Sequence, residues 1–234
     1  MSISYGQFCP VAIASEVLCS RWTVLVIREL MCGSSRFNQI RRGVPLMSPS
    51  LLSKRLSELS DQGVVDIHEL ESNIVEYHLS PAGRELIPLI ESFGIWGKRW
   101  FNGDVNLSKL DAALLMWDIR RLMKPDELIA AGCVIEFCFP ELTSKKQHHW
   151  MVVGNGDVDY CILDPGKNTD LLITSTVKAL TSIHMGYSSI EDEIAHGSLS
   201  INGNPKIAKT MSQWLCHSPF ATEPQKSPQL TYSH

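Results

Sequence analysis

The stretch that decides the fold of the first half of the chain is SPSLLSKRLSELSDQG, residues 48–63. It opens with a serine suited to cap a helix and a proline suited to the first helical position, and it closes on a glycine. Leu52, Leu56 and Leu59 share one face of the helix that this pattern predicts over 49–62. The opposite face carries serines and Lys54. The pattern therefore predicts an amphipathic helix with a small, polar and cationic outer face.

The elements predicted around this helix complete a recognisable topology. They are helices over 21–32 and 36–42, a hairpin of 64–70 with 74–79, and a helix running from Ser80 to Trp100. Pro88 predicts a kink in the last helix. Its apolar stripe consists of Leu86, Leu89, Ile90, Phe93, Trp96 and Trp100. Three helices, a hairpin and a final helix predict a winged helix-turn-helix.

The overall composition excludes several classes of protein. The chain has 234 residues, 44% of them hydrophobic, with 21 basic and 25 acidic residues and a net charge of −4. Wholesale disorder is excluded. The absence of a long apolar run and of a signal-peptide pattern predicts a cytoplasmic protein without a membrane partner. Seven cysteines without a short repeated spacing indicate reduced thiols. The acidic balance argues against a protein that coats nucleic acid through bulk charge.

The charge is, however, unevenly distributed. Residues 21–60 hold seven basic and two acidic residues, a local charge of +5, whereas residues 61–91 hold seven acidic residues and Arg84. A helix that enters the DNA major groove needs small polar groups and a cation on its outer face, which the helix over 49–62 supplies. Arg36, Arg41 and Arg42 are candidates for contacts with backbone phosphates. The alternative is a small helical bundle with a merely polar surface.

At this point the first half of the chain resembles the HxlR-type winged-helix regulators, over about residues 8–101. The motifs that carry the resemblance are Cys9-Pro10-Val11, RWTVLVIREL at 21–30, RFNQI at 36–40, SPSLLSKRL at 48–56 and YHLSPAG at 77–83. The resemblance implies a homodimer formed through the first and last helices of this domain, bound to a pseudo-palindromic double-stranded DNA operator. It implies DNA contacts from the recognition helix and its surroundings, at Ser48, Pro49, Ser50, Ser53, Lys54 and Ser57, with Arg36 as a backbone clamp and Arg55 as a flank contact.

The wing departs from the family pattern, whereas the N-terminal cysteine follows it. The wing, residues 68–74, carries Glu69 and Glu71 and no arginine, although wings of the family often present a basic residue to the minor groove. Cys9 matches the cysteine that senses oxidants or electrophiles in some members, which makes it a candidate redox sensor. The alternative is an inert cysteine, since no cation near it in sequence is placed to favour the thiolate.

The second half predicts an α/β domain. Its expected elements are a helix over 107–123, strands over 133–139, 150–153, 158–163, 171–174 and 198–202, helices over 177–185 and 190–196, and a last helix from Pro205. The fold class is therefore α+β with two domains. The predicted boundaries are 1–103 for the winged helix, 104–221 for the second domain and 222–234 for a disordered tail.

The second half shows no pattern of catalytic chemistry. It lacks the motifs of serine hydrolases, zinc proteases and phosphate-binding loops, and Glu136, Asp159 and Asp164 have no evident partner. His148 and His149 occupy adjacent strand positions, which point to opposite faces and cannot chelate one metal together. The chain is therefore not expected to be an enzyme, and neither a metal nor a cofactor is expected.

Residues of about 110–221 are similar to the sterol carrier protein family, including the form fused behind HxlR-type domains in bacteria. The resemblance rests on LMWDIRR at 115–121, HWMVV at 149–153, the strand 158–163 followed by Asp164-Pro165-Gly166, DLLI at 170–173, IAHGSLSING at 194–203, and Trp214-Leu215. It implies a sheet covered by helices, with a cavity for an apolar or lipid-like ligand. The candidate pocket residues are Trp117, Phe137, Phe139, Trp150, Val152, Tyr160, Ile162 and Leu171. The alternative for these side chains is a packed core.

Together these observations predict a dimeric, sequence-specific transcriptional regulator. Its operator affinity would be modulated by an apolar small-molecule effector bound in the second domain. Two alternatives remain. One is a lipid or apolar-ligand carrier that uses the winged helix only for dimerisation, and the other is a thiol-based redox regulator acting through Cys9.

Overall fold

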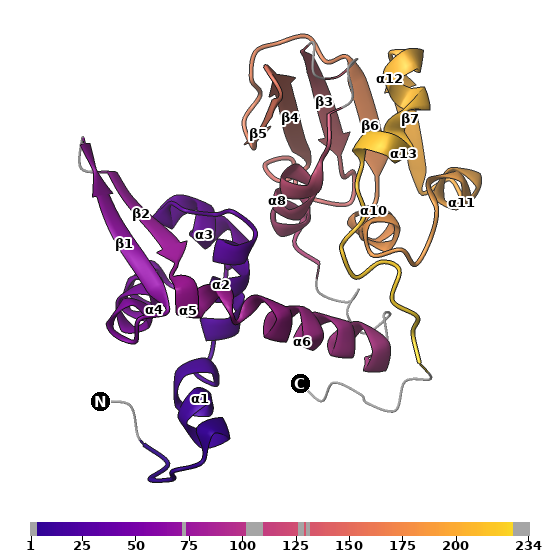
Figure 1. The fold of residues 1–234 in the computed structure, drawn as a ribbon. Coiled ribbons are helices and arrows are strands. Elements are labelled where there is room, and N and C mark those ends of the chain that lie inside the picture. Colours follow the sequence, from indigo (N-terminus) through magenta and orange to yellow (C-terminus); the bar gives the residue numbers. More distant parts are fainter. Residues whose placement is uncertain (1–3, 72–73, 102–109, 126–128, 130–131, 227–234) are drawn as a thin grey trace. The chain divides into compact units, whose positions relative to one another are not determined.

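The computed structural model describes residues 4–71, 74–101, 110–125, 129 and 132–226. The chain separates into two compact units, Met1–Gly94 and Ile95–His234 (Figure 1). Among the described residues no single helix has the length and apolar composition of a membrane span. The bent pair formed by the first two helices passes the same test when both are taken together.

The first unit is a helical domain with one hairpin. Its elements are α1 (Pro10–Leu18), α2 (Thr23–Met31), α3 (Phe37–Gly43), α4 (Pro49–Asp61), β1 (Val65–Leu70), β2 (Ile74–Leu79), α5 (Pro81–Arg84) and the first part of α6 (Ile87–Trp100). The two strands pair antiparallel from Val65 opposite Leu79 to Leu70 opposite Ile74. This order of helices and hairpin is the winged helix-turn-helix that the sequence predicts.

Helix α4 forms as its sequence dictates. The Ser48 hydroxyl accepts a hydrogen bond from the Leu51 backbone N–H, and Pro49 occupies the first helical position, where its missing N–H costs nothing. Leu52, Leu56 and Leu59 are each at most 1% exposed and belong to the core of the first unit. The burial of three leucines therefore fixes which face of α4 is left for contacts with other molecules.

The predicted long helix from Ser80 to Trp100 is instead two helices, α5 and α6, interrupted at Glu85 and Leu86. The Ser80 hydroxyl accepts from the Gly83 N–H and donates to the Gly63 carbonyl, which anchors α5 to the end of α4. A Cβ at position 83 would collide with the Val64 carbonyl oxygen, so the close approach requires glycine. The kink predicted at Pro88 is displaced to the interruption before α6, and Pro88 itself lies in the first turn of α6, where proline breaks no hydrogen bond.

The second unit is built on a five-stranded sheet with helices packed against it. The elements are α8 (Ala112–Leu122), β3 (Cys133–Cys138), β4 (His148–Gly154), β5 (Asp157–Cys161), β6 (Leu171–Ser175), α10 (Val177–His184), α11 (Ile190–Ala195), β7 (Leu199–Gly203), α12 (Pro205–Lys209) and α13 (Met211–Trp214). The strand order is β5-β4-β3-β6-β7. Strands β3 and β6 are parallel, and the other neighbours are antiparallel.

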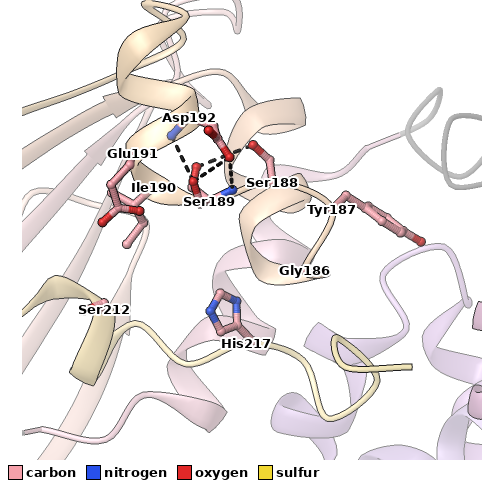
Figure 2. A pocket seen from close by; sticks show the side chains of 9 residues that line it. All are labelled: Gly186, Tyr187, Ser188, Ser189, Ile190, Glu191, Asp192, Ser212 and His217. Carbon is pink, nitrogen blue, oxygen red and sulfur yellow. Dashed lines mark hydrogen bonds between the residues drawn. The ribbon is translucent and has the colours of Figure 1, made fainter. Parts of the chain in front are cut away.

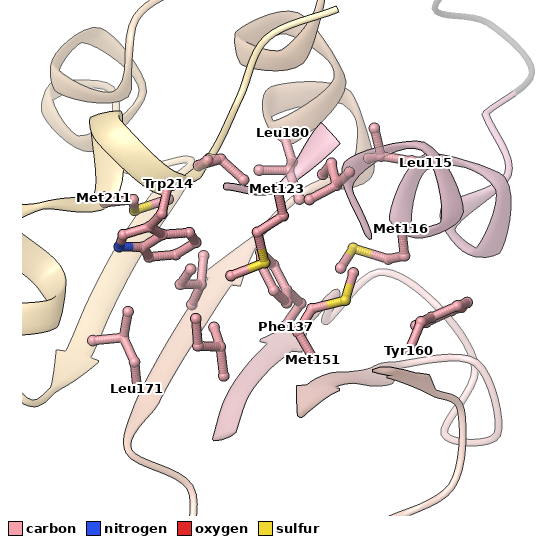
Figure 3. Packing of buried hydrophobic residues seen from close by; sticks show 14 of the residues in the cluster. Leu115, Met116, Met123, Phe137, Met151, Tyr160, Leu171, Leu180, Met211 and Trp214 are labelled. Atoms are coloured by element: carbon pink, nitrogen blue, oxygen red, sulfur yellow. The ribbon is translucent and has the colours of Figure 1, made fainter. Parts of the chain in front are cut away.

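The core of the second unit lies between one face of the sheet and its helices. Along β4 the side chains of His149, Met151 and Val153 are buried, whereas the alternate residues are only half-buried. Residues of α8, α10, α12 and α13 pack against the buried face. Figure 3 shows Met116, Met123 and Met151 gathered around Phe137 in this core. The second unit is thus sheet-rich and covered by helices on its buried face, as predicted.

Part of the predicted disordered tail makes defined contacts. The Glu223 carboxylate lies 2.7 Å from the Arg99 guanidinium, and the Lys226 N–H donates to the Arg99 carbonyl at 2.9 Å. Composition alone did not indicate these contacts. Residues 227–234 of the predicted tail lie outside the described residues.

Candidate nucleic-acid interface

The outer face of α4 presents the side chains that the sequence singles out for DNA contact. All six are exposed, and Lys54 has 71% of its side chain accessible. Its ammonium lies 3.8 Å from the Glu58 carboxylate, an exposed ion pair that is weak enough to give way to a phosphate. The six residues of this face are Ser48, Pro49, Ser50, Ser53, Lys54 and Ser57. The surface offers hydroxyls, one exposed cation and no bulky side chain, which suits both base edges and phosphates.

Arg55 differs from its neighbour Lys54. Only 15% of its side chain is exposed, its guanidinium lies 2.6 Å from the Glu58 carboxylate, and it also reaches the Arg21 carbonyl at 3.5 Å. These contacts hold the side chain along the protein surface. The flank contact expected of Arg55 thus has less geometric support than a contact from Lys54.

Arg36 stands at the start of α3, where it is exposed and adjoins the hairpin. Its backbone forms an isolated bridge with Glu76 of β2, and the Ser35 carbonyl accepts from the Tyr77 N–H at 2.8 Å. The Arg36 Nε lies 3.5 Å from Glu76 Oε1. The predicted backbone clamp is therefore already in contact with a carboxylate of the hairpin.

The sequence pattern did not single out Glu29. This residue of α2 is fully buried, and its carboxylate lies against the end of α3. Arg28 pairs with it at 2.6 Å and also donates to the Gly43 carbonyl at 3.0 Å, while the Ser34 hydroxyl donates to the second carboxylate oxygen. A Cβ at position 43 would collide with this carboxylate. Glu29 thus ties together the two helices that precede α4. In the sequence, only the glycine that ends the 36–42 pattern hints at this close packing.

Large apolar side chains are exposed on α6 and around α1. On α6, Leu89 is 52% and Phe93 59% exposed, and Trp96 is exposed as well, although all three belong to the predicted apolar stripe. Phe8, Val11 and Ile13 are exposed around α1. Exposed apolar side chains of this size are candidates for contacts with another protein. These are the two helices through which the family resemblance implies dimerisation.

The eight predicted pocket residues do not share one surface. Five of them are buried in the packed core of the second unit: Trp117, Phe137, Phe139, Tyr160 and Leu171. Trp150 and Val152 lie on the face of β4 that points away from this core. Ile162 lies beyond the end of β5, with 61% of its surface exposed. The period of two along β4 explains the split, since residues of even and odd number point to opposite faces.

A cavity of about 450 Å³ lies at a different place in the second unit, around the start of α11 (Figure 2). None of the eight predicted residues lines it. Tyr187, one of its lining residues, lies under the Lys98 ammonium, which is 3.3 Å from the ring centroid and donates to the Met185 carbonyl at 2.8 Å. Burial lowers the pKa of Lys98 to about 8. The lining residues are Gly186, Tyr187, Ser188, Ser189, Ile190, Glu191, Asp192, Ser212 and His217.

The adjacent histidines of β4 point apart, as predicted. His148 Nδ1 lies 2.7 Å from Glu136 on one face, whereas His149 is buried on the other, 2.7 Å from the Tyr160 hydroxyl and 3.0 Å from the Lys146 carbonyl. Burial lowers the pKa of His149, and the hydrogen bond to Lys146 partly opposes that change. Among the described residues no group of three or more histidine, cysteine or acidic side chains is arranged to hold a metal ion.

The buried histidine predicts how the second unit responds to acid. Because the pKa of His149 is lower in the folded than in the unfolded chain, the unfolded chain binds more protons below about pH 6.5. The free energy of unfolding is therefore expected to fall as the pH is lowered through 6.5 towards 5. Burial lowers the pKa of His184 too, so it contributes in the same direction.

Urea unfolding followed by tryptophan fluorescence at pH 5, 6 and 7 measures this response. His149→Gln keeps a polar partner for Tyr160 but cannot titrate, so its stability should fall less between pH 7 and 5 than that of the parent. His196→Gln, at an exposed histidine after α11, serves as the control. Its free energy of unfolding should fall between pH 7 and 5 as much as that of the parent. Equal losses in the parent and in His149→Gln would contradict the prediction.

Cys9 is the residue just before α1 and is half-buried. Its proposed role as a redox sensor stays a prediction.

Comparisons with known proteins agree on the class of the first unit. A family model described as HxlR-like helix-turn-helix matches residues 17–105. The "Uncharacterized HTH-type transcriptional regulator YvaP" of Bacillus subtilis (strain 168) is 32% identical over 103 residues, which cover 43% of this chain and 95% of YvaP. The "Uncharacterized HTH-type transcriptional regulator sll1512" of Synechocystis sp. is 32% identical over 97 residues, which cover 41% and 72% of the two chains.

A solved structure, the reduced form of the transcriptional regulator YodB from B. subtilis, is 29% identical, with 39% of this chain and 93% of YodB covered and a TM-score of 0.35. The matched family residues contain α4 with its polar outer face and the hairpin that follows it. The match with YvaP extends over nearly the whole of that protein. This chain belongs to the HxlR-like helix-turn-helix family.

Proposed function

We propose that this protein is a dimeric, sequence-specific transcriptional regulator that places α4 of each protomer in the major groove of DNA. The observation that carries the proposal is the division of α4 into two faces. Three leucines hold the helix in the core, and the serines and Lys54 on the other side are exposed. A helix of this kind fits the major groove, with its first turn near the base edges. The proposal places the protein in the cytoplasm, where bacterial DNA lies.

A dimer would allow two copies of α4 to contact the same DNA duplex. Two recognition helices related by a two-fold axis fit half-sites about 34 Å apart, one turn of DNA, so the operator is expected to be a pseudo-palindrome. The exposed apolar residues of α6 and those around α1 supply the candidate dimer surface. In this proposal residues 1–103 bind DNA and dimerise, whereas residues 104–221 form the ligand-binding part.

Selection from a pool of random DNA duplexes tests the function directly. The parent protein should enrich an inverted repeat whose half-site centres lie about 10 base pairs apart. Affinity for unrelated duplexes should be much weaker and should fall steeply with salt, because the net negative charge leaves few cations for nonspecific contacts. Failure to enrich any sequence would overturn the proposal of a sequence-specific regulator.

An apolar effector in the second unit is the proposed means of regulation. It is supported by the methionines of the core, Met116, Met123, Met151 and Met211, which lie where the helices meet the sheet. Methionine side chains adapt their shape readily, so such a core is better able than a rigid one to open around an apolar guest. A guest that binds one state of the dimer better than the other would change operator affinity.

Native mass spectrometry of the purified protein tests this part of the proposal. It is expected to show a dimer carrying a co-purified apolar molecule, and removal of that molecule should change operator affinity. An effector role fails if the molecule is bound and released without any change in DNA binding. Ligand binding by a protein that selects no DNA sequence would instead favour the carrier alternative.

A further inference from the structure

One carboxylate of the hairpin contacts two basic side chains at once. Glu76 Oε1 lies 3.5 Å from the Arg36 Nε, and Glu76 Oε2 lies 3.1 Å from the His78 Nε2. The carboxylate is only 21% exposed, whereas the side chains of Arg36 and His78 are 55% and 47% exposed. Arg36, which is expected to contact the DNA backbone, therefore shares the Glu76 carboxylate with His78.

The remaining titratable groups on this face of the hairpin can be read from the strand register. His68 is opposite Glu76, and Asp66 is opposite His78, so these four side chains lie on one face. The His68 and His78 rings meet edge to face, with centroids 5.4 Å apart. Residues 64–79 contain neither lysine nor arginine. The hairpin can therefore gain positive charge only through its two histidines.

We propose that Glu76 is a positioning residue that draws Arg36 away from DNA, and that protonation of His78, assisted by His68, releases Arg36 so that operator affinity rises as the pH falls. The proposal rests on the proposed function, since it concerns the grip of the same surface on DNA. It gives a role to the acidic wing, which lacks the basic residue that such wings often present.

The direction of the effect follows from charge. When His78 is neutral, Arg36 is the charged partner of Glu76, and this contact competes with the attraction of Arg36 for phosphate. A protonated His78 neutralises Glu76 from the other side, weakens its hold on Arg36 and adds a positive charge to the face near DNA. Because phosphate stabilises both cations, the DNA complex takes up protons, and acid strengthens binding.

Fluorescence anisotropy with the selected operator tests the proposal at pH 6.0, 7.0 and 8.0 and constant ionic strength. The parent is expected to bind about five- to tenfold more tightly at pH 6.0 than at pH 8.0. The slope of log K against log salt should be steeper by about one phosphate contact at pH 6.0. His78→Gln should bind as the parent does at pH 8.0 but gain about twofold or less on acidification.

Glu76→Gln provides an independent variant. Without the carboxylate, Arg36 is available at every pH, so operator affinity at pH 8.0 should already approach that of the parent at pH 6.0. His196→Gln, in the second unit, is the matched control and should keep the full pH response. Thermal unfolding at each pH checks that every variant remains folded over the range used.

The outcomes separate this proposal from the function on which it rests. An operator bound equally well by the parent at pH 6.0 and 8.0 would overturn the proposal while leaving the regulator intact. So would a full pH response in His78→Gln, or unchanged affinity at pH 8.0 in folded Glu76→Gln. Absence of binding to any selected duplex at every pH would overturn the proposed function, and this proposal with it.

Discussion

Replacing Ser53 and Lys54 together by glutamate is expected to weaken operator binding by at least about 100-fold. The double variant changes the charge of the outer face of α4 by −3 and places two carboxylates where phosphates and base edges are expected. Each of these positions is exposed and outside the core, so the thermal stability of the first unit should change little. Anisotropy with the operator and with an unrelated duplex measures the loss.

The chain offers a matched control for this variant. Ser144 and Lys145 form the same dipeptide in an exposed loop of the second unit, so Ser144→Glu with Lys145→Glu makes the same change of charge elsewhere. The control should bind the operator as the parent does, at every salt concentration. Equal losses in the two double variants would show that total charge, rather than the α4 surface, governs binding, and would contradict the assignment of the interface.

Replacing Leu89 and Phe93 by aspartate is expected to convert the proposed dimer into a monomer. Both side chains are more than half exposed on α6, and aspartates there would bury unpaired charge in any interface formed through this helix. A monomer contacts a single half-site, so operator affinity should fall by at least about 100-fold. Light scattering coupled to size-exclusion chromatography reports the mass, and anisotropy reports the affinity.

Ile162 and Leu163 provide the control for the dimer surface. They are 61% and 78% exposed, so Ile162→Asp with Leu163→Asp introduces the same charges at apolar residues of the second unit. That variant should remain a dimer and bind the operator as the parent does. If Leu89→Asp with Phe93→Asp keeps the mass of a dimer, the interface does not involve α6, and α1 becomes the surface to examine.

Most of the fold could be predicted because its signals are local. A serine-proline pair begins both α4 and α5, leucines at helical spacing face the core, and turns rich in glycine and asparagine separate the strands of the second unit. The outer face of α4 follows from the same periodicity. For this reason the six side chains of that face that are expected to contact DNA are all exposed.

What could not be predicted depends on contacts between residues distant in sequence. The break before α6 arises because Ser80 and Gly83 dock on residues 63 and 64, which no local pattern encodes. Arg55 looks like a DNA contact in sequence, yet Glu58 and the Arg21 carbonyl hold it. The predicted pocket combined core residues with Trp150 and Val152 on the other face of the sheet, because apolar character alone does not tell which face a helix will cover.

The separation of core residues from exposed residues on α4 also affects how regulators of this kind can change the DNA sequence that they bind. Leu52, Leu56 and Leu59 carry the packing, so substitutions at positions 50, 53, 54 and 57 leave the core untouched. New operators can therefore be explored through these positions while the free energy of folding stays nearly constant. Duplicated copies of the gene would be free to acquire separate targets without first acquiring compensating mutations in the scaffold.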